Sequence, residues 1–256
     1  MNKSSTIATL LCARLQSLAG KLMDAQSRLT SPDPEALHDF RVALRELRSL
    51  VQPVRKALYG ADELDALAAT CARPTNLLRD REVLCLELTR KGEHALHDIL
   101  QTLIQEDLQD LASRQPAEAL TQRLLSLTVY WEKYLVGKDW ARVDKCLRKS
   151  RDKQRRRLKK ALRAADTDLH RLRIWIKRYR YFLESYRSLF PKTRPELMKS
   201  IKDAQELTGN WHDRHVWIQA VNAHPELQAL VTGWMDESLQ LQFPIQEIRL
   251  QLRNLL

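Results

Sequence analysis

Turn-forming residues are too scarce in this chain for most folds built from strands. Only 6 glycines and 9 prolines occur among 256 residues, and Leu, Ala, Arg, Gln and Glu predominate. A fold of many short strands needs Gly and Pro at its turns, and a nucleotide-binding loop needs several glycines together. The sequence therefore predicts an all-α fold.

The cysteines indicate reduced, buried thiols. A chain of this length buries a core without disulfides. Its four cysteines, Cys12, Cys71, Cys85 and Cys146, are far apart and form no Cys-x-x-Cys pair. A disulfide scaffold and a zinc ribbon are thus excluded, and the pattern is typical of a cytoplasmic protein. No apolar run approaches the roughly 20 residues that cross a bilayer, so we expect a soluble protein.

The first residues faintly resemble a secretion signal. A basic start at Met1–Lys3 precedes the apolar run Ile7–Ala13. Arg14 interrupts this run, and no cleavage site of small residues follows. We therefore interpret the segment as an ordinary first helix.

The positive charge is concentrated in one segment. The formal net charge is +11, and residues 141–182 hold 17 Lys and Arg against 4 Asp and Glu. The other 214 residues hold 26 against 28. Such a basic segment favours a polyanionic partner and says nothing about the fold.

Two segments of the chain align without a gap. They are LHDFRVALRELR, starting at Leu37, and LHRLRIWIKRYR, starting at Leu169. Each has a His followed by Arg or Lys 3, 7, 10 and 17 residues later. Asp80-Arg-Glu-Val and Asp213-Arg-His-Val then follow at 42 and 43 residues after the His. The parallel spacing predicts an internal duplication, with halves at 1–136 and 137–256.

Each half is expected to hold several helices. Asp33 can cap the second helix with Pro34 in its first turn, and Pro53 should kink its end. The expected helices are 6–29, 34–58, 62–71, 76–90, 94–113 and 118–134, then 139–164, 167–190, 194–208, 211–222 and 225–254.

On each His-led helix the bases share one face. At 100° per residue, the basic offsets fall within about 100° of the His, and a row of apolar residues lies opposite. That row is the predicted core, formed by Phe40, Leu44, Leu47, Val51, Val54 and Leu58, and by Leu172, Ile176, Tyr179, Leu183, Tyr186 and Phe190. The preceding helices carry similar basic stripes at a spacing of seven residues.

These stripes favour an extended anion. We expect no acidic residues on these stripes. The like charges then destabilise each helix by a few tenths of a kcal/mol per pair, and a bound anion would explain why this cost is tolerated. Bases that step by roughly 5 Å along a helix suit an anion that offers oxygen to every turn, and Arg suits forked contact with phosphate. The alternative is a solvated surface, which stays open for residues 151–163. The predicted groove residues are His38, Arg41, Arg45, Arg48, Arg55, His170, Arg173, Lys177, Arg180 and Arg187, with Arg14, Lys21, Arg28, Lys149, Arg156, Arg163 and Arg79.

The duplicated motif resembles the CHAD family, the conserved histidine α-helical domain. The match is carried by the two His-x-x-Arg-x-x-x-Arg/Lys-x-x-Arg helices, starting at His38 and His170, and by the Asp80 and Asp213 segments. The resemblance implies two pseudo-symmetric helical bundles with a basic central cavity that binds inorganic polyphosphate. It implies polyphosphate contacts at His38, Arg41, Arg45, Arg48, His170, Arg173, Lys177 and Arg180. Family members are often fused to a catalytic triphosphate-tunnel domain rich in Glu-x-Glu-x-Lys strands. This sequence has nothing like it, so we expect the binding module to stand alone.

The histidines have two readings each. His38 and His170 lie in first turns, where the helix dipole disfavours imidazolium, yet a neutral ring still donates one N–H to a phosphate oxygen. A structural role is equally compatible with the pattern. The pairs His94/His97 and His212/His215 lack further ligands at a metal-binding spacing, so no metal site and no cofactor are predicted.

No arrangement typical of catalysis is present. We find no Gly-rich loop, nucleophile elbow, Cys/His constellation or fixed carboxylate pair. Few aromatics accompany the stripes, which disfavours stacking on nucleobases. The sequence predicts a non-catalytic polyphosphate-binding protein of the cytoplasm, associated with polyphosphate granules. The alternatives are an RNA-binding protein and, less favoured, a metal-dependent phosphohydrolase.

Overall fold

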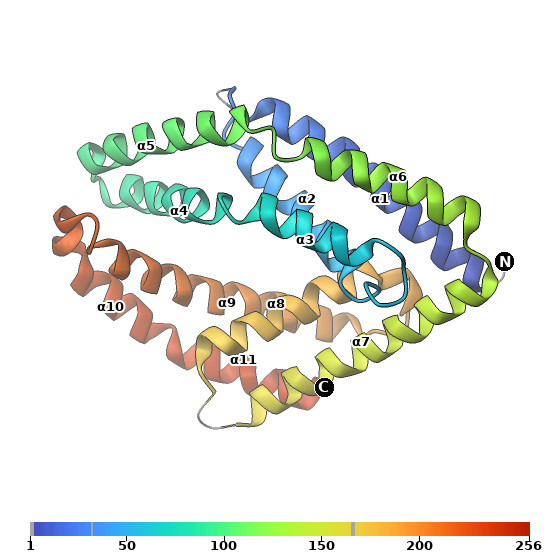
Figure 1. Cartoon of the computed structure of the whole chain (residues 1–256). Coiled ribbons are helices and arrows are strands. Elements are labelled where there is room, and N and C mark those ends of the chain that lie inside the picture. Colours follow the sequence, from blue (N-terminus) through green and yellow to red (C-terminus); the bar gives the residue numbers. More distant parts are fainter. Residues whose placement is uncertain (1–2, 32, 165–166) are drawn as a thin grey trace. The chain divides into compact units, whose positions relative to one another are not determined.

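The computed structural model describes residues 3–31, 33–164 and 167–256, and these contain helices and turns but no strand (Figure 1). The predicted all-α fold is confirmed. None of the helices in these ranges is long and apolar enough to span a membrane.

The chain forms two compact units, Met1–Ser150 (unit 1) and Arg151–Leu256 (unit 2). The division falls inside α7 (Gly137–Arg163), which is one helix. The predicted halves meet just before this helix, at 136/137, and the internal duplication stays a prediction.

Unit 1 is built from antiparallel helix pairs (Figure 1). α1 packs against α2 and α6, α2 packs against α3, and α4 pairs with α5. The helices are α1 (Lys3–Arg28), α2 (Ala36–Val51), α3 (Ala61–Ala72), α4 (Thr75–Lys91), α5 (His94–Ser113) and α6 (Glu118–Tyr134).

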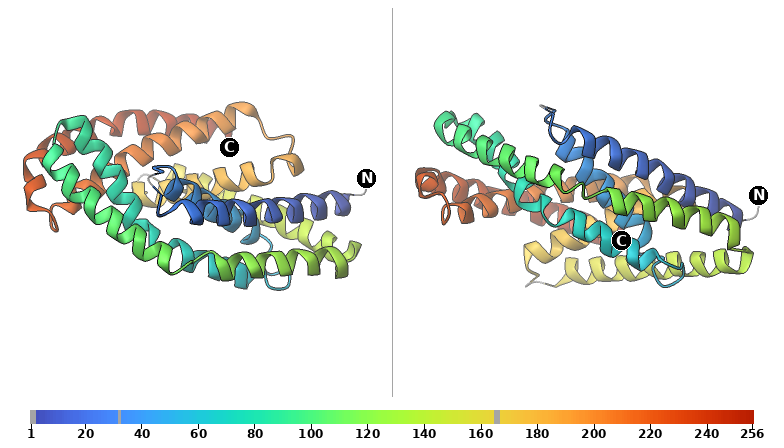
Figure 2. Two further views of the ribbon diagram at one scale, coloured as in Figure 1. Left: turned by 90° about the horizontal axis from the view of Figure 1, so that it is seen from above. Right: turned by 45° about the horizontal axis from the view of Figure 1, so that its top comes forward.

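Unit 2 is organised around one long helix, α9, which packs against α8, α10 and α11 (Figure 2). The elements after α7 are α8 (Leu169–Ser185), the short 3₁₀ helix η1 (Arg187–Leu189), α9 (Pro195–Ala220), the 3₁₀ helix η2 (Pro225–Leu230), α10 (Val231–Gln240) and α11 (Gln242–Leu255).

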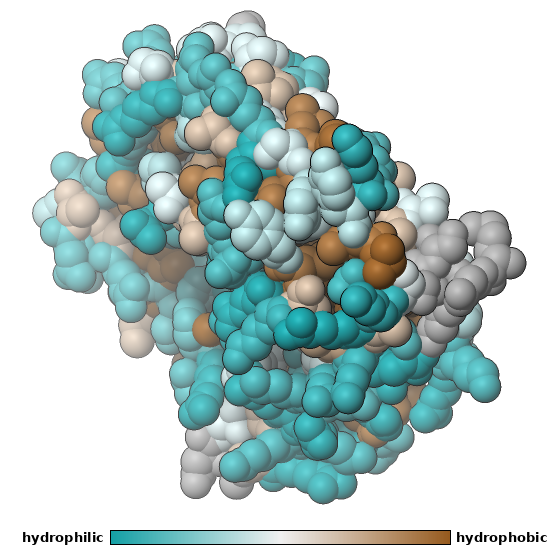
Figure 3. Space-filling model, turned by 45° about the vertical axis from the view of Figure 1, so that its right-hand side comes forward, coloured by the Kyte–Doolittle hydropathy of each residue, from teal (hydrophilic) through white to brown (hydrophobic). Residues whose placement is uncertain are grey.

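The predicted core faces of the two His-led helices, α2 and α8, are confirmed. All twelve apolar residues assigned to these faces are buried. At 3.6 residues per turn this burial leaves the other face of each helix for the basic residues. The face of the molecule drawn in Figure 3 is mostly hydrophilic, with apolar side chains in separate groups.

Several helix boundaries differ from prediction because of proline and glycine. α2 ends at Val51, two residues before Pro53, which therefore ends the helix rather than kinking it. α9 continues through Gly209, where we expected a break. The predicted helix 225–254 is divided, since Pro244 in the first turn of α11 has no N–H to continue α10. The predicted helix 167–190 is also shorter in the structure, where α8 ends at Ser185 and the 3₁₀ helix η1 follows.

Three of the four free cysteines are buried, as expected. Cys12, Cys71 and Cys85 are buried, while Cys146 is half-buried. Burial raises the pKa of the Cys12 thiol to about 12 and those of Cys71 and Cys85 to about 11.

Gly60 is the position in unit 1 where the backbone most needs glycine. It has φ of 75°, and a Cβ there would lie 2.7 Å from Cδ1 and Cδ2 of Leu127. We expect Gly60→Ala to lower the free energy of unfolding by about 2 kcal/mol, from left-handed backbone strain and crowding. Urea unfolding followed by circular dichroism measures this.

Gly20 provides the matched control. It lies inside α1, and a Cβ there would meet nothing within 4 Å. Gly20→Ala should raise the free energy of unfolding by about 0.5–1 kcal/mol, because alanine favours a helix interior. Equal stability of Gly60→Ala and the wild type would contradict the strain argument.

Candidate functional site

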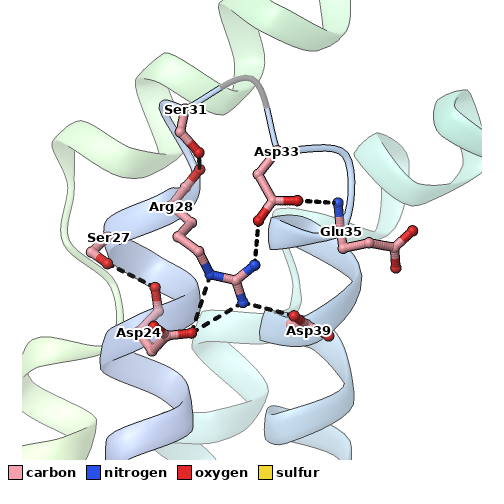
Figure 4. A network of polar contacts seen from close by, with 7 residues as sticks. All are labelled: Asp24, Ser27, Arg28, Ser31, Asp33, Glu35 and Asp39. Carbon is pink, nitrogen blue, oxygen red and sulfur yellow. Dashed lines mark hydrogen bonds and ion pairs between the residues drawn. The ribbon is translucent and has the colours of Figure 1, made fainter.

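Arg28, at the end of α1, is held by carboxylates. Its guanidinium lies 3.1 Å from Asp24 and 2.7 Å from Asp39, and it also binds Asp33 (Figure 4). The hydrogen bonds that Arg28 donates, to Asp39 first and then to Asp33, raise its pKa. Asp33 also accepts a hydrogen bond from the backbone N–H of Glu35, but the N-cap of α2 is Glu35 itself, so the prediction that Asp33 caps this helix is wrong. Arg28 thus ties α1 to the start of α2.

Other stripe arginines are also paired. Arg14 on α1 binds Glu46 on α2. Arg48 lies 2.9 Å from Asp65 on α3, and Arg55 lies 3.8 Å from the same carboxylate.

Short-range pairs occur on the helices themselves. Arg180 lies 2.7 Å from Glu184, and Arg79 lies 3.0 Å from Glu82. The expectation that nothing acidic relieves the stripes is therefore wrong. Glu46, Asp65 and Asp39 each belong to a neighbouring helix, so periodicity along one helix could not place them.

Five further stripe residues are exposed. Their side chains lie on the surface of α1, α7 and η1, and they are Lys21, Lys149, Arg156, Arg163 and Arg187.

In unit 1 the structure brings together four of the predicted residues. This unit 1 cluster consists of His38, Arg41 and Arg45 on α2 and Arg79 on α4. Arg41 is half-buried and donates to the Thr75 hydroxyl and, at 3.2 Å, to the Asn76 side-chain oxygen. Helix α4 thus supplies the two side chains that hold Arg41 in place, and it also supplies Arg79, the fourth basic residue of the cluster.

The charge on Arg41 is disfavoured where it lies. Burial lowers the pKa of Arg41 below its ordinary value, and the neighbouring Arg79 and Arg45 lower it further. Asp80 and Glu82 oppose that shift without cancelling it. Burial is thus the main reason why the charge on Arg41 is disfavoured, and the two neighbouring arginines add to that effect.

Glu82 is, with Asp80, one of two acids that act on this cluster. Burial raises its pKa, although Arg79, Arg41 and His38 act to lower it. Because its charged form is penalised by desolvation, Glu82 balances the cluster only in part.

Unit 2 holds a comparable group of bases. The unit 2 cluster consists of His170, Arg173 and Lys177 on α8 and His212 and His215 on α9. The rings of His170 and His212 have their centroids 5.2 Å apart. The pKa of His212 is lowered to about 4, and burial is the largest cause. The other causes included in this value are its neighbours Arg173, His170, Lys177 and His215.

The two clusters share one sequence relationship. Each joins the His, +3 and +7 residues of its His-led helix to a base that directly precedes an aspartate on another helix. That base is Arg79 before Asp80 in unit 1 and His212 before Asp213 in unit 2. The sequence prediction omitted His212 from the site, although its alignment with Arg79 was the available signal.

The basic end of α7 contributes partly to packing. Arg151 lies over the Phe190 ring at 4.9 Å, and Arg157 lies over Trp175 at 4.8 Å. Arg155 donates to the backbone oxygen of Leu256. Arg151, Arg155 and Arg157 therefore contact other residues of the protein. For these three residues, the alternative of an ordinary helix surface is the better interpretation.

The part of the chain that the structure describes contains no group of three or more His, Cys, Asp or Glu side chains arranged to hold a metal ion. Of the two predicted histidine pairs, His97 lies 3.0 Å from Asp98 through Nδ1, and His215 stacks on Trp211 with ring centroids 4.2 Å apart.

Comparison with known proteins decides the family. The sequence model of the CHAD domain family matches residues 13–222 of this chain. The chain belongs to the CHAD family. The crystal structure of the CHAD domain from the plant Ricinus communis is similar, with a TM-score of 0.71. The match covers 97% of this chain and 91% of the plant one at 20% sequence identity, so the plant CHAD domain supports the fold. A search of curated proteins gave no match.

Proposed function

We propose that this CHAD chain binds inorganic polyphosphate without catalysing a reaction on it. One observation supports this above the others: each unit holds a cluster in which the positive charge of a half-buried base is disfavoured by burial first and also by neighbouring bases. In unit 1 that base is Arg41, and in unit 2 it is His212. An anion in either cluster would relieve the repulsion, so both clusters suit phosphate oxygens.

The spacing of the bases favours a polymer. Along each His-led helix the bases recur every three or four residues, about 5 Å of helix axis. Arginine forks can hold two oxygens of one phosphate, and successive bases can hold successive phosphates. A chain of phosphates fits this geometry better than a single small anion.

The aromatic residues of α8 argue against nucleobase stacking. Tyr179 is buried, and Trp175 is covered by Arg157 and Arg178 at 4.8 and 5.2 Å. RNA is the second candidate, because the exposed bases Lys149, Arg156 and Arg163 on α7 suit a nucleic-acid backbone. A metal-dependent phosphohydrolase is the third.

Competition binding tests the proposal. A fluorescent long-chain polyphosphate is bound to the full chain and displaced with unlabelled polyphosphate or with single-stranded RNA at equal phosphate concentration. We expect polyphosphate to compete at least about tenfold better than RNA, because RNA gains little from stacking here. Affinity should also fall steeply with salt through counterion release.

Two outcomes would contradict this proposal. Equal or better competition by RNA would favour a nucleic-acid-binding protein. Release of phosphate from polyphosphate in the presence of Mg²⁺ or Mn²⁺ would favour an enzyme. Association with polyphosphate granules in the cytoplasm is the cellular expectation, and a fluorescent fusion compared with a granule stain tests it.

A further inference from the structure

His212 and His170 form a close pair within a group of fixed cations. Their ring centroids are 5.2 Å apart, so one helix, α8, and its packing partner, α9, each supply one imidazole. Arg173 and Lys177, one and two turns further along α8, are near enough to act on His212. Imidazole is the one side chain in this group whose charge changes in the physiological pH range.

The charged groups around His212 come from two helices. From α8 these are His170, Arg173 and Lys177, and α9 itself supplies His215 and the adjoining carboxylate Asp213. On each of the other two helices that pack on α9, one charged residue has a partner away from His212. On α10, Glu237 lies 3.1 Å from Arg214, and on α11, Arg249 donates to backbone oxygens at the end of α7.

We propose that the unit 2 cluster is a proton-coupled phosphate site, in which His212 takes up a proton from solvent when a phosphate group binds. This rests on the proposed polyphosphate binding. Without the anion, a positive charge on His212 is repelled by Arg173 and Lys177, and His212 is a neutral imidazole. A phosphate oxygen placed between these bases reverses the local field, so the protonated ring donates an N–H to that oxygen.

The direction of the pH dependence follows. Burial and neighbouring cations hold the pKa of free His212 at about 4, and a bound anion favours the protonated form. Binding therefore takes up a proton, and affinity rises as pH falls. We expect about a tenfold gain between pH 8 and pH 6.

In unit 1 the position that corresponds to His212 is occupied by a permanent base. This residue is Arg79, and arginine is charged throughout this pH range. At this position unit 1 thus has a base that is always charged, and unit 2 has a base whose charge depends on pH. Exchanging the two residue types should exchange these properties.

The experiment measures binding of long-chain inorganic polyphosphate to the full chain by calorimetry at pH 6 and pH 8. Interior phosphates of a long chain stay ionised across this range, so the titration belongs to the protein. His212→Gln should lose most of the tenfold gain between pH 8 and pH 6. His212→Arg should bind at pH 8 as tightly as the wild type does at pH 6. Arg79→His should make binding more dependent on pH.

Proton uptake is read separately, from the change of binding enthalpy with the ionisation enthalpy of the buffer. The wild type at pH 6–7 should take up more protons than His212→Gln does. If His212→Gln keeps the whole pH dependence and proton uptake of the wild type, the inference is overturned while polyphosphate binding stands. If the wild type binds no polyphosphate at either pH, both the inference and the proposed function fail.

Discussion

Replacing Arg45 and Lys177 together by glutamate is expected to lower polyphosphate affinity by about a hundredfold or more, because each change puts a repelling carboxylate into one cluster. Arg45 acts on Arg41 in unit 1, and Lys177 acts on His212 in unit 2. Both side chains lie on the basic faces of α2 and α8, away from the buried rows, so the helices should still form. Binding is measured by fluorescence anisotropy, and helical content by circular dichroism.

A matched control distinguishes the effect of the two clusters from the effect of overall net charge. Lys138→Glu with Arg171→Glu makes the same change in net charge, at exposed positions in the first turns of α7 and α8. An acidic side chain in the first turn interacts favourably with the helix dipole and stabilises the helix, so this control should fold well. It should lose only a few-fold in affinity. Equal loss in both double variants would mean that overall charge, rather than the clusters, governs binding.

Full affinity in the folded Arg45/Lys177 variant would place the site elsewhere. The exposed bases of α7, Arg156 and Arg163 among them, would then be the first alternative.

Replacing Arg249 by methionine is expected to lower the free energy of unfolding by about 3 kcal/mol, because backbone oxygens at the end of α7 would lose a buried donor. Arg249 on α11 is 8% exposed. It donates at 3.0 Å to the oxygen of Leu162, at 3.4 Å to that of Ala161, and also to Ala164. A cation at the carboxyl end of a helix also favours the helix dipole.

Arg249→Lys is the informative control. It keeps the charge beside the carbonyl groups but loses the guanidinium fork, so its loss in stability should fall between those of the wild type and Arg249→Met. Thermal and urea unfolding measure all three proteins. A methionine variant as stable as the wild type would show that water replaces the guanidinium without cost.

Local sequence signals predicted the helices where stop and start residues were unambiguous. The boundaries of α5 and α6, His94–Ser113 and Glu118–Tyr134, agree with the prediction. Gly209 misled it, because tertiary packing along α9 outweighs the modest cost of glycine inside a helix. Pro53 was recognised as disruptive, and its effect was larger than predicted because the helix ended before it.

The candidate site could be predicted only as far as one helix determines it. Spacing alone placed His38, Arg41 and Arg45 on one face of α2. It could not show that Glu46 would bind Arg14, 32 residues away, or that Asp65 would bind Arg48. Such pairs depend on which helices become neighbours, and a periodicity has no information about that.

The pairing of His170 with His212 is a second example. These residues lie 42 positions apart, and the predicted break at Gly209 obscured the fact that one helix, α9, carries His212 along α8. The duplicated spacing contained the clue, since Arg79 occupies the matching position.

The unequal burial of the cysteines has a practical consequence. Cys12, Cys71 and Cys85 are enclosed and their thiols resist ionisation, whereas Cys146 on α7 is only half-buried. A maleimide dye added to the native chain should therefore attach selectively to Cys146, because thiolate formation governs that reaction. The chain thus offers a natural single labelling position for optical measurements, and the other three thiols become reactive only when the helices around them open.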